Sequence, residues 1–145
     1  PPDFFAYSVG TNDGNVPYNE FKPEIYKSNL EKMMQMALRA NPNCALLLTV
    51  PNDSYYKRRY LNKNIERERT MIIELAREYN MAVWDLYGVM GGLGSSKTWE
   101  SNGLMRGDLI HFTHSGYHFK AELYIDSLLK FIDQMEKIKT TNNKL

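Results

Sequence analysis

The sequence has a single cysteine, Cys44, so no disulfide can form within the chain. Because Cys44 precedes an apolar run, we expect it to be a small buried residue. No apolar stretch approaches the roughly 18 residues that a membrane-spanning helix needs, and no signal peptide is recognisable. The chain begins at Pro1 rather than at a methionine, so the absence of a signal peptide does not indicate a compartment.

The sequence also lacks an excess of charge of either sign. Its 18 Lys and Arg residues stand against 17 Asp and Glu residues, which gives a formal net charge of +1. Residues 55–60 (YYKRRY) mix aromatic and basic side chains, as single-strand nucleic-acid sites do. A loop that faces polysaccharide or solvent fits the balanced charge better. We therefore expect no nucleic-acid partner.

Short apolar runs alternate along the chain with longer segments of helical spacing. The predicted strands lie at 4–9, 45–50 and 81–86, and the predicted helices at 23–40, 63–79 and 115–137. Such an order is typical of a parallel sheet covered by helices. We expect one domain over residues 1–139 and a frayed polar tail at 140–145.

The apolar positions of each predicted helix indicate its buried face. The expected inner residues are Ile25, Asn29, Met33, Met36 and Ala40 in the first helix, Ile65, Ile72, Leu75, Ala76 and Tyr79 in the second, and Ala121, Tyr124, Leu128, Ile132 and Met135 in the last. Segments 52–62 and 87–107 are expected to be long loops.

Sites in parallel sheets lie at the carboxyl ends of the strands, so the segment after the first strand is a candidate. It contains Gly10-Thr11-Asn12-Asp13. A glycine allows a sharp turn off the sheet, and the amide of Asn12 could stabilise the negative oxygen of a tetrahedral intermediate. The alternative is an ordinary polar turn.

A second candidate lies just before the last predicted helix, where Asp108 precedes His111 by three residues. A carboxylate at this spacing can accept the Nδ1 proton of the histidine and leave Nε2 free to act as a base. The alternative is a surface aspartate beside a structural histidine. His111, His114 and His118 also suggest a metal site, but no Cys, Asp or Glu is placed to complete one, so we expect no metal.

Together the two motifs resemble signature blocks of the SGNH (GDSL-type) hydrolases. Residues 108–117 (DLIHFTHSGY) are similar to the closing block of that family, including its Gly-Tyr. The longer run 83–117 resembles bacterial members that deacylate cell-wall or other polysaccharides. The resemblance extends from Phe4 to about Leu129.

The resemblance implies a three-layer, flavodoxin-like α/β sandwich with a central parallel sheet. It implies a serine esterase that needs no cofactor and hydrolyses acetyl esters of a carbohydrate or similar substrate. Asn12 would then be an oxyanion-hole donor, His111 the general base and Asp108 its orienting acid. A periplasmic or secreted location would also follow.

The sequence departs from the family in lacking the first two blocks, a Gly-Asp-Ser motif and a glycine of the oxyanion hole. None of its serines has that context, and Ser95 and Ser96 lack a strand-to-turn setting. We therefore expect the nucleophile and the first two strands to belong to a missing N-terminal segment, which would act as a partner of this chain. The alternatives are a catalytically incomplete glycan-binding module and an inactive fragment.

The segment 87–107 leads from a strand to Asp108, so it should border the site. With Gly10, the glycines Gly91 and Gly92 are candidate substrate-binding residues because they would let the backbone lie close to a substrate. Trp99 is either a platform for a sugar ring or an anchor of this segment.

Overall fold

The computed structural model of the chain describes residues 1–142. Its elements, in chain order, are β1 (Phe4–Tyr7), α1 (Pro23–Ala40), β2 (Ala45–Val50), β3 (Tyr55–Tyr56), β4 (Tyr60–Leu61), α2 (Asn64–Glu78), β5 (Ala82–Asp85), α3 (Leu86–Met90), α4 (Ser95–Ser101) and α5 (His114–Asn142). Strands β1, β2 and β5 form a parallel sheet in that spatial order, while β3 and β4 form a separate antiparallel hairpin. The predicted α/β architecture with a parallel sheet is confirmed.

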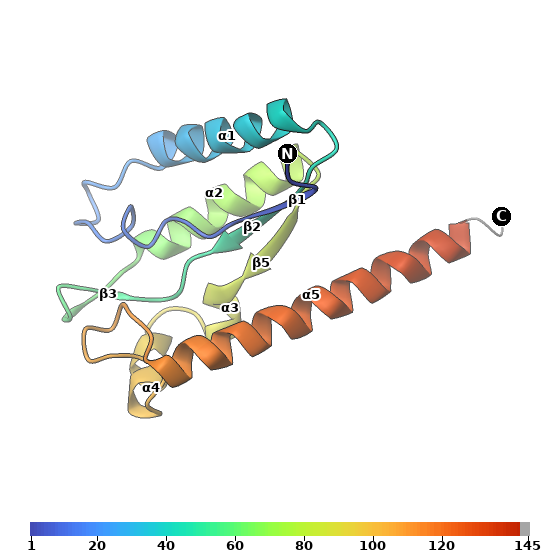
Figure 1. Cartoon of the computed structure of the whole chain (residues 1–145). Coiled ribbons are helices and arrows are strands. Elements are labelled where there is room, and N and C mark those ends of the chain that lie inside the picture. The colour runs from blue at the N-terminus through green and yellow to red at the C-terminus, as the bar shows by residue number, and fades with distance from the viewer. Residues whose placement is uncertain (143–145) are drawn as a thin grey trace.

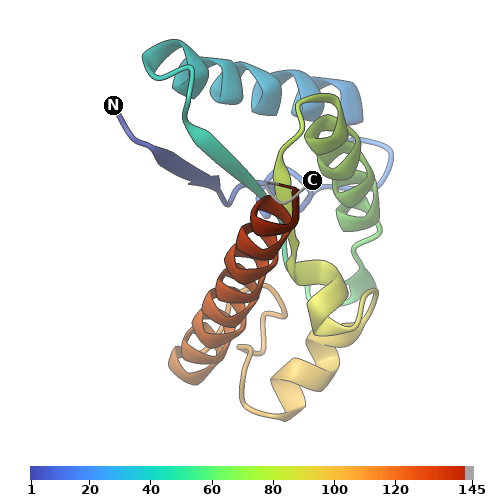
Figure 2. The ribbon, with the colours of Figure 1, turned by 90° about the vertical axis from the view of Figure 1, so that its right-hand side faces the viewer.

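Helices cover both faces of the sheet (Figures 1 and 2). Alternate side chains of β2 point to opposite faces. Leu46, Leu48 and Val50 pack with α1 and α2, whereas Leu47 packs with Trp84 on the face toward α5. This burial on both sides explains why the central strand is apolar at every position except Thr49.

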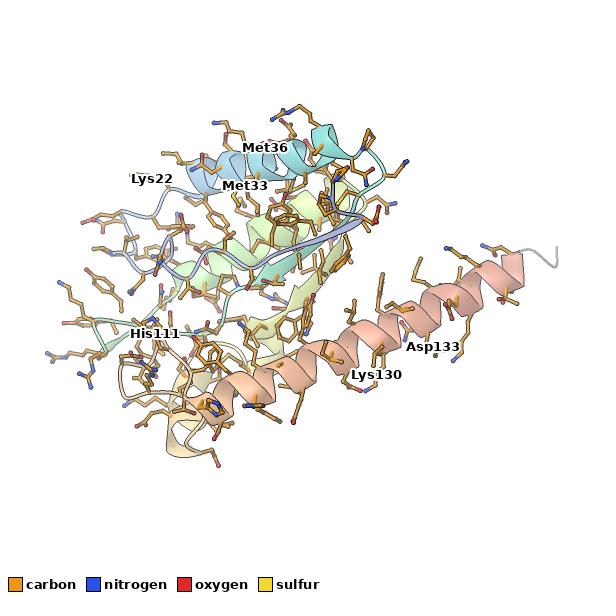
Figure 3. The ribbon with its side chains drawn as sticks, viewed as in Figure 1. Lys22, Met33, Met36, His111, Lys130 and Asp133 are labelled. Atoms are coloured by element: carbon orange, nitrogen blue, oxygen red, sulfur yellow. The ribbon has the colours of Figure 1, made fainter. Side chains whose placement is uncertain are left out.

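The predicted bounds of the first helix are confirmed, but its predicted inner face is wrong. The buried residues of α1 are Tyr26, Leu30, Met34 and Ala37. Ile25 and the labelled Met33 and Met36 are exposed (Figure 3). Both stripes have helical spacing, and contact with the sheet and α2 selects the one that starts at Tyr26. The inner face of α2 agrees better with its prediction, since Ile65, Ile72, Leu75 and Ala76 are buried.

The two segments predicted to be long loops both contain regular structure. Residues 52–62 include the β3–β4 hairpin, and residues 87–107 include α3 and α4. Asp85 begins α3 by accepting a hydrogen bond from the backbone N–H of Gly88 at 3.0 Å. Helices of five and seven residues are too short to show a periodic pattern, so they could not be predicted from periodicity.

Helix α5 is longer and more exposed than predicted. Of its predicted inner residues only Tyr124 and Leu128 are partly buried, while Ile132 and Met135 are exposed. The 29 residues of α5 extend well beyond strands of four to six residues (Figure 1). Residues 140–142 belong to the helix rather than to a polar tail, and 143–145 lie outside the described residues.

Within the described residues, strand β1 lies at an edge of the sheet and pairs with β2 alone, so its other side is open. Its Phe4 and Phe5 side chains are 47% and 41% exposed. Among the described residues, no helix combines the length and the apolar character needed to cross a membrane.

Candidate active site

The carboxyl ends of the three parallel strands meet at one edge of the sheet. The segment after β1, the β3–β4 hairpin and the segment before α5 gather there (Figure 1). His111 is labelled at this edge in Figure 3. The structure thus brings the segments that carry Asn12 and Asp108–His111 to the same end of the sheet, which is where the sequence placed them.

Asp108 and His111 form the predicted hydrogen-bonded pair, with 2.9 Å between Oδ2 of Asp108 and Nδ1 of His111. The other carboxylate oxygen of Asp108 accepts hydrogen bonds from the backbone N–H groups of Ile110 and His111, each at 2.9 Å. Burial acts to raise the pKa of Asp108, but these backbone bonds and the His111 ring outweigh it and lower that pKa to about 2. Asp108 is therefore ionised at neutral pH and can hold the His111 ring in one orientation and tautomer.

The segment that carries this pair is held in a constrained conformation. Leu109 has a positive φ of 59°, which is rare for a residue with a branched side chain. The backbone N–H of Arg106 donates to the carbonyl of His111 at 2.8 Å, and the N–H of Leu109 donates to the carbonyl of Arg106 at 2.9 Å. Such strain persists only where surrounding contacts fix the backbone.

Contacts from the region after β2 supply this support. The buried side chain of Asn52 donates to the carbonyl of Ile110 at 3.1 Å. The backbone N–H of Tyr55 donates to the carbonyl of Leu109 at 3.1 Å, and Nε of Arg58 donates to the carbonyl of Gly107 at 3.0 Å. Sequence reasoning missed Asn52, whose only signal was its place at the carboxyl end of a strand.

The Gly-Tyr of the closing block, Gly116-Tyr117, lies in the first turn of α5. Thr113 Oγ1 accepts a hydrogen bond from the N–H of Gly116 at 3.1 Å and donates to the carbonyl of Gly103 at 2.7 Å. A Cβ atom on Gly116 would lie 1.8 Å from the carbonyl oxygen of Leu104. Only glycine therefore allows α5 to start this close to the preceding segment.

The segment after β1 turns sharply at Gly10, which has a φ of 118°. A Cβ atom there would lie 2.8 Å from both Pro51 and the hydroxyl of Tyr26. The turn continues with a hydrogen bond from the N–H of Gly14 to the carbonyl of Gly10 at 2.9 Å. Asn12 is exposed within this turn. Gly10 shapes the turn, and its crowded surroundings argue against direct contact with a substrate.

A buried glutamate of α2, Glu68, lies beneath this turn. Its carboxylate oxygens would lie about 3 Å from Cβ atoms placed on Gly10 or Gly14. Burial, with the negative charge of Asp13 as a smaller cause, raises the pKa of Glu68 to about 9. Glu68 is therefore a neutral acid at pH 7, packed against the segment that carries Asn12.

The glycines and tryptophan of segment 87–107 have structural roles. Gly91 ends α3 with a φ of 113°, and Gly92 follows with a φ of 78°. Trp99 is buried, donates from Nε1 to the carbonyl of Met90 at 3.2 Å, and packs against Phe112. Its ring is not available to a sugar, so the anchor alternative fits the structure and the platform alternative does not.

Ser96 also has a structural role, in a hydrogen bond with Asp53. Its hydroxyl donates to the buried carboxylate of Asp53 at 2.7 Å, and its backbone N–H donates to the same oxygen at 2.9 Å. Burial raises the pKa of Asp53, while these bonds act to lower it.

Within residues 1–142, the His111 ring makes its one hydrogen bond to Asp108. No group of three or more His, Cys, Asp or Glu side chains in that range could hold a metal ion.

Residues 1–119 match the model of the GDSL-like lipase/acylhydrolase family. The chain belongs to this family. The matched range includes both β1 with its Asn12 turn and the Asp108–His111 segment, so the two motifs occur within one family domain. No curated protein sequence matches the chain.

Solved structures show the same fold at low sequence identity. A peptidoglycan O-acetylesterase superimposes with a TM-score of 0.81 at 22% identity, over 91% of this chain and 38% of that one. A lipase/acylhydrolase from Enterococcus faecalis gives 0.66 at 20% identity, over 88% and 61%. The esterase domain of the zebrafish ZfL2-1 retrotransposon ORF1 protein gives 0.55 at 21% identity, over 86% and 66%. The chain therefore spans well under half of the peptidoglycan O-acetylesterase.

Proposed function

We propose that this chain forms part of a serine esterase that removes acetyl groups from a carbohydrate. The observation that carries the proposal is the pair of Asp108 and His111, joined at 2.9 Å at the carboxyl edge of a parallel sheet. Membership of an acylhydrolase family supports the reaction class. The peptidoglycan O-acetylesterase with the same fold supports the acetyl ester as substrate.

In the proposed mechanism, His111 accepts a proton at Nε2 from a serine hydroxyl, whose oxygen then attacks the ester carbonyl. The negative oxygen of the tetrahedral intermediate accepts a hydrogen bond from the amide of Asn12. Collapse of that intermediate expels the sugar hydroxyl, which takes the proton from His111. A water molecule then releases acetate from the serine by the same sequence. Throughout, Asp108 fixes the ring and stabilises the imidazolium.

We place the nucleophilic serine in a segment of the protein outside these 145 residues. Ser96 is occupied by Asp53, Ser54 accepts from Asn62 in the interior, and Ser101 and Ser127 donate to carbonyls of their own helices. The open edge of β1 is where additional strands of the same sheet would pair. A glycan-binding module without catalysis is the second candidate. Within the described residues, the His111 ring is hydrogen-bonded to Asp108 and to no serine hydroxyl that it could activate.

The test uses the whole protein that contains this chain and a fluorophosphonate, which reacts with activated serines. We expect one serine outside residues 1–145 to be labelled, and we expect the labelling rate to fall sharply in His111→Ala. Peptide mapping by mass spectrometry locates the modified residue. Labelling of a serine within this chain would contradict the assignment, and no labelling would favour the binding module.

A further inference from the structure

A groove lies between the segment after β1 and the β3–β4 hairpin. It has a volume of about 570 Å³, within the range of small-molecule and saccharide sites. Its lining residues are Val16, Pro17, Tyr18, Tyr56, Tyr60, Leu61, Asn62, Lys63 and Asn64. The side-chain amide of Asn62 donates to the hydroxyl of Ser54, and that of Asn64 donates to the carbonyls of Gly14 and Val16. The tyrosines and Lys63 therefore provide the groups that remain for a ligand.

Each of the three tyrosines carries a cation against its ring. Lys57 Nζ lies 5.3 Å from the ring centre of Tyr56, and the guanidinium of Arg59 lies 5.6 Å from that of Tyr60. The guanidinium of Arg67 lies 4.7 Å from the ring centre of Tyr18. With Lys63 in the lining, positive charge reaches the groove from several sides.

No acidic side chain lines the groove beside these cations. Its lining residues include no Asp or Glu, and the sequence from 54 to 65 contains four basic residues and no acidic one. The two acids that flank this stretch have other partners, since Asp53 accepts a hydrogen bond from the hydroxyl of Ser96 at 2.7 Å and Glu66 accepts one from the hydroxyl of Tyr87 at 3.1 Å. This local charge contrasts with the net charge of +1 for the whole chain.

The walls of the groove belong to, or contact, the two segments of the proposed mechanism. Val16 in its wall follows Asn12 by four residues. The hairpin on its other side contacts the Asp108–His111 segment through Arg58 and Tyr55, as described above. A polymer whose acetyl group is at His111 could therefore place neighbouring units in the groove.

We propose that this groove binds the saccharide units of an acidic glycan ester, with tyrosine rings against the sugars and the Lys and Arg side chains against their carboxylates. The assignment rests on the proposed esterase function and narrows its substrate class. Tyrosine combines an apolar ring with a polar hydroxyl. Exposed cations attract a carboxylate by an amount that added salt reduces. An acidic glycan matches both features and can carry the acetyl ester on which the proposed esterase acts, so we favour it over a nucleic acid.

The test measures acetate release by the whole protein from O-acetylated oligogalacturonate, from O-acetylated neutral oligogalactan of equal length, and from p-nitrophenyl acetate. We expect Lys57→Gln/Arg59→Gln to lower kcat/KM for the acidic substrate about 3- to 10-fold at low salt, through KM. We expect little change for the other two substrates and a loss of the effect at about 1 M salt. Lys130→Gln/Lys137→Gln, which removes two cations of α5, is the matched control and should change nothing.

The tyrosine contribution has its own pair of variants. We expect Tyr60→Ala to raise KM for both oligosaccharides but not for p-nitrophenyl acetate, and we expect Tyr60→Phe, which keeps the ring, to retain the wild-type KM. Equal activity of the wild type on acidic and neutral glycans, or equal losses on all three substrates, would overturn the proposal. Tighter binding of single-stranded oligouridylate than of oligogalacturonate would also overturn it.

A calorimetric titration with unacetylated oligogalacturonate separates this proposal from the esterase function. Binding by the wild type that is weakened in Lys57→Gln/Arg59→Gln would support the groove as a glycan site. If the same protein failed to hydrolyse p-nitrophenyl acetate, the esterase function alone would be refuted. Hydrolysis of p-nitrophenyl acetate without such binding would refute the groove alone.

Discussion

At the scale of single residues, the candidate site depends on one hydrogen-bonded pair within a short segment and on Asn12 in the turn after β1. A carboxylate three residues before a histidine can reach its ring through a single turn of chain, and the structure shows the Asp108–His111 bond. Asn12 could be placed at the carboxyl edge because it follows a strand. Its oxyanion role stays a prediction, since it concerns a transition state.

Replacement of Asn12 tests that role. We expect Asn12→Ala to lower kcat for p-nitrophenyl acetate by roughly 10²–10³ with a smaller effect on KM, because the oxyanion forms only in the transition state. Asn15→Ala, in the same turn, is the control and should retain most of kcat. Steady-state kinetics of the whole protein would exclude Asn12 from the mechanism if its kcat were unchanged.

Glu68 was not predicted, although the sequence held a signal for it. It falls on the same stripe of α2 as Ile65, Ile72 and Leu75, which are all buried. An acidic residue on an apolar stripe indicates either a solvent-facing interruption or a buried neutral acid. The segment after β1 packs over Glu68, and this tertiary contact identifies it as the buried acid.

The raised pKa of Glu68 makes stability depend on pH. The folded protein keeps a proton on this group between pH 4.5 and about 9, where the unfolded chain has lost it. The free energy of unfolding should therefore fall as pH rises through that range, by up to about 1.4 kcal/mol per pH unit. We expect Glu68→Gln to remove much of this slope. Denaturant unfolding of the whole protein at pH 6, 7 and 8 measures it, and identical slopes in both proteins would contradict the assignment.

At the scale of elements, the bounds of α1, α2 and the central strand could be predicted to within one residue, but the end of α5 and some of the helix faces could not. Pro23 fits the first turn of α1, and β2 coincides with a run that is apolar except at Thr49. In α1, however, the methionines make two adjacent stripes equally apolar, and tertiary contacts choose between them. The short helices α3 and α4 depend on caps and on anchors such as Trp99.

The anchor role of Trp99 predicts a loss of stability without a loss of substrate affinity. We expect Trp99→Ala to reduce the free energy of unfolding by about 3–5 kcal/mol, the usual effect of truncating a large buried aromatic. Trp99→Phe should retain more of it and should keep the wild-type KM for a glycan ester. A raised KM with an unchanged Tm in Trp99→Phe would restore the platform alternative.

At the scale of the whole molecule, the order of elements predicted the layers but not how fully they are covered. Phe4 and Phe5 on β1 are exposed, as are Phe131, Ile132 and Met135 on α5. An apolar cavity of about 140 Å³ lies between these elements, lined by Phe4, Leu47, Trp84, Tyr124 and Phe131, among others. Sequence periodicity reports which side chains are apolar, whereas the coverage of an edge depends on neighbouring strands.

These exposed surfaces predict the behaviour of residues 1–145 produced alone. We expect the chain to self-associate, because an open apolar strand edge can pair with another copy, and we expect no turnover of p-nitrophenyl acetate. Sedimentation velocity over a range of concentrations, with an activity assay on the same samples, checks both. A stable monomer with His111-dependent turnover would show that the nucleophile lies within this chain.

Catalysis by the Asp108–His111 pair predicts that two nearby histidines of the whole protein respond differently to replacement. In steady-state hydrolysis of p-nitrophenyl acetate, we predict that His111→Ala loses activity by roughly 10²–10⁴, the usual contribution of a general base. His114→Ala, three residues further along the chain, should keep near wild-type activity, and both variants should keep the wild-type Tm. Retained activity in His111→Ala, or an equal loss in His114→Ala, would show that His111 is not the general base.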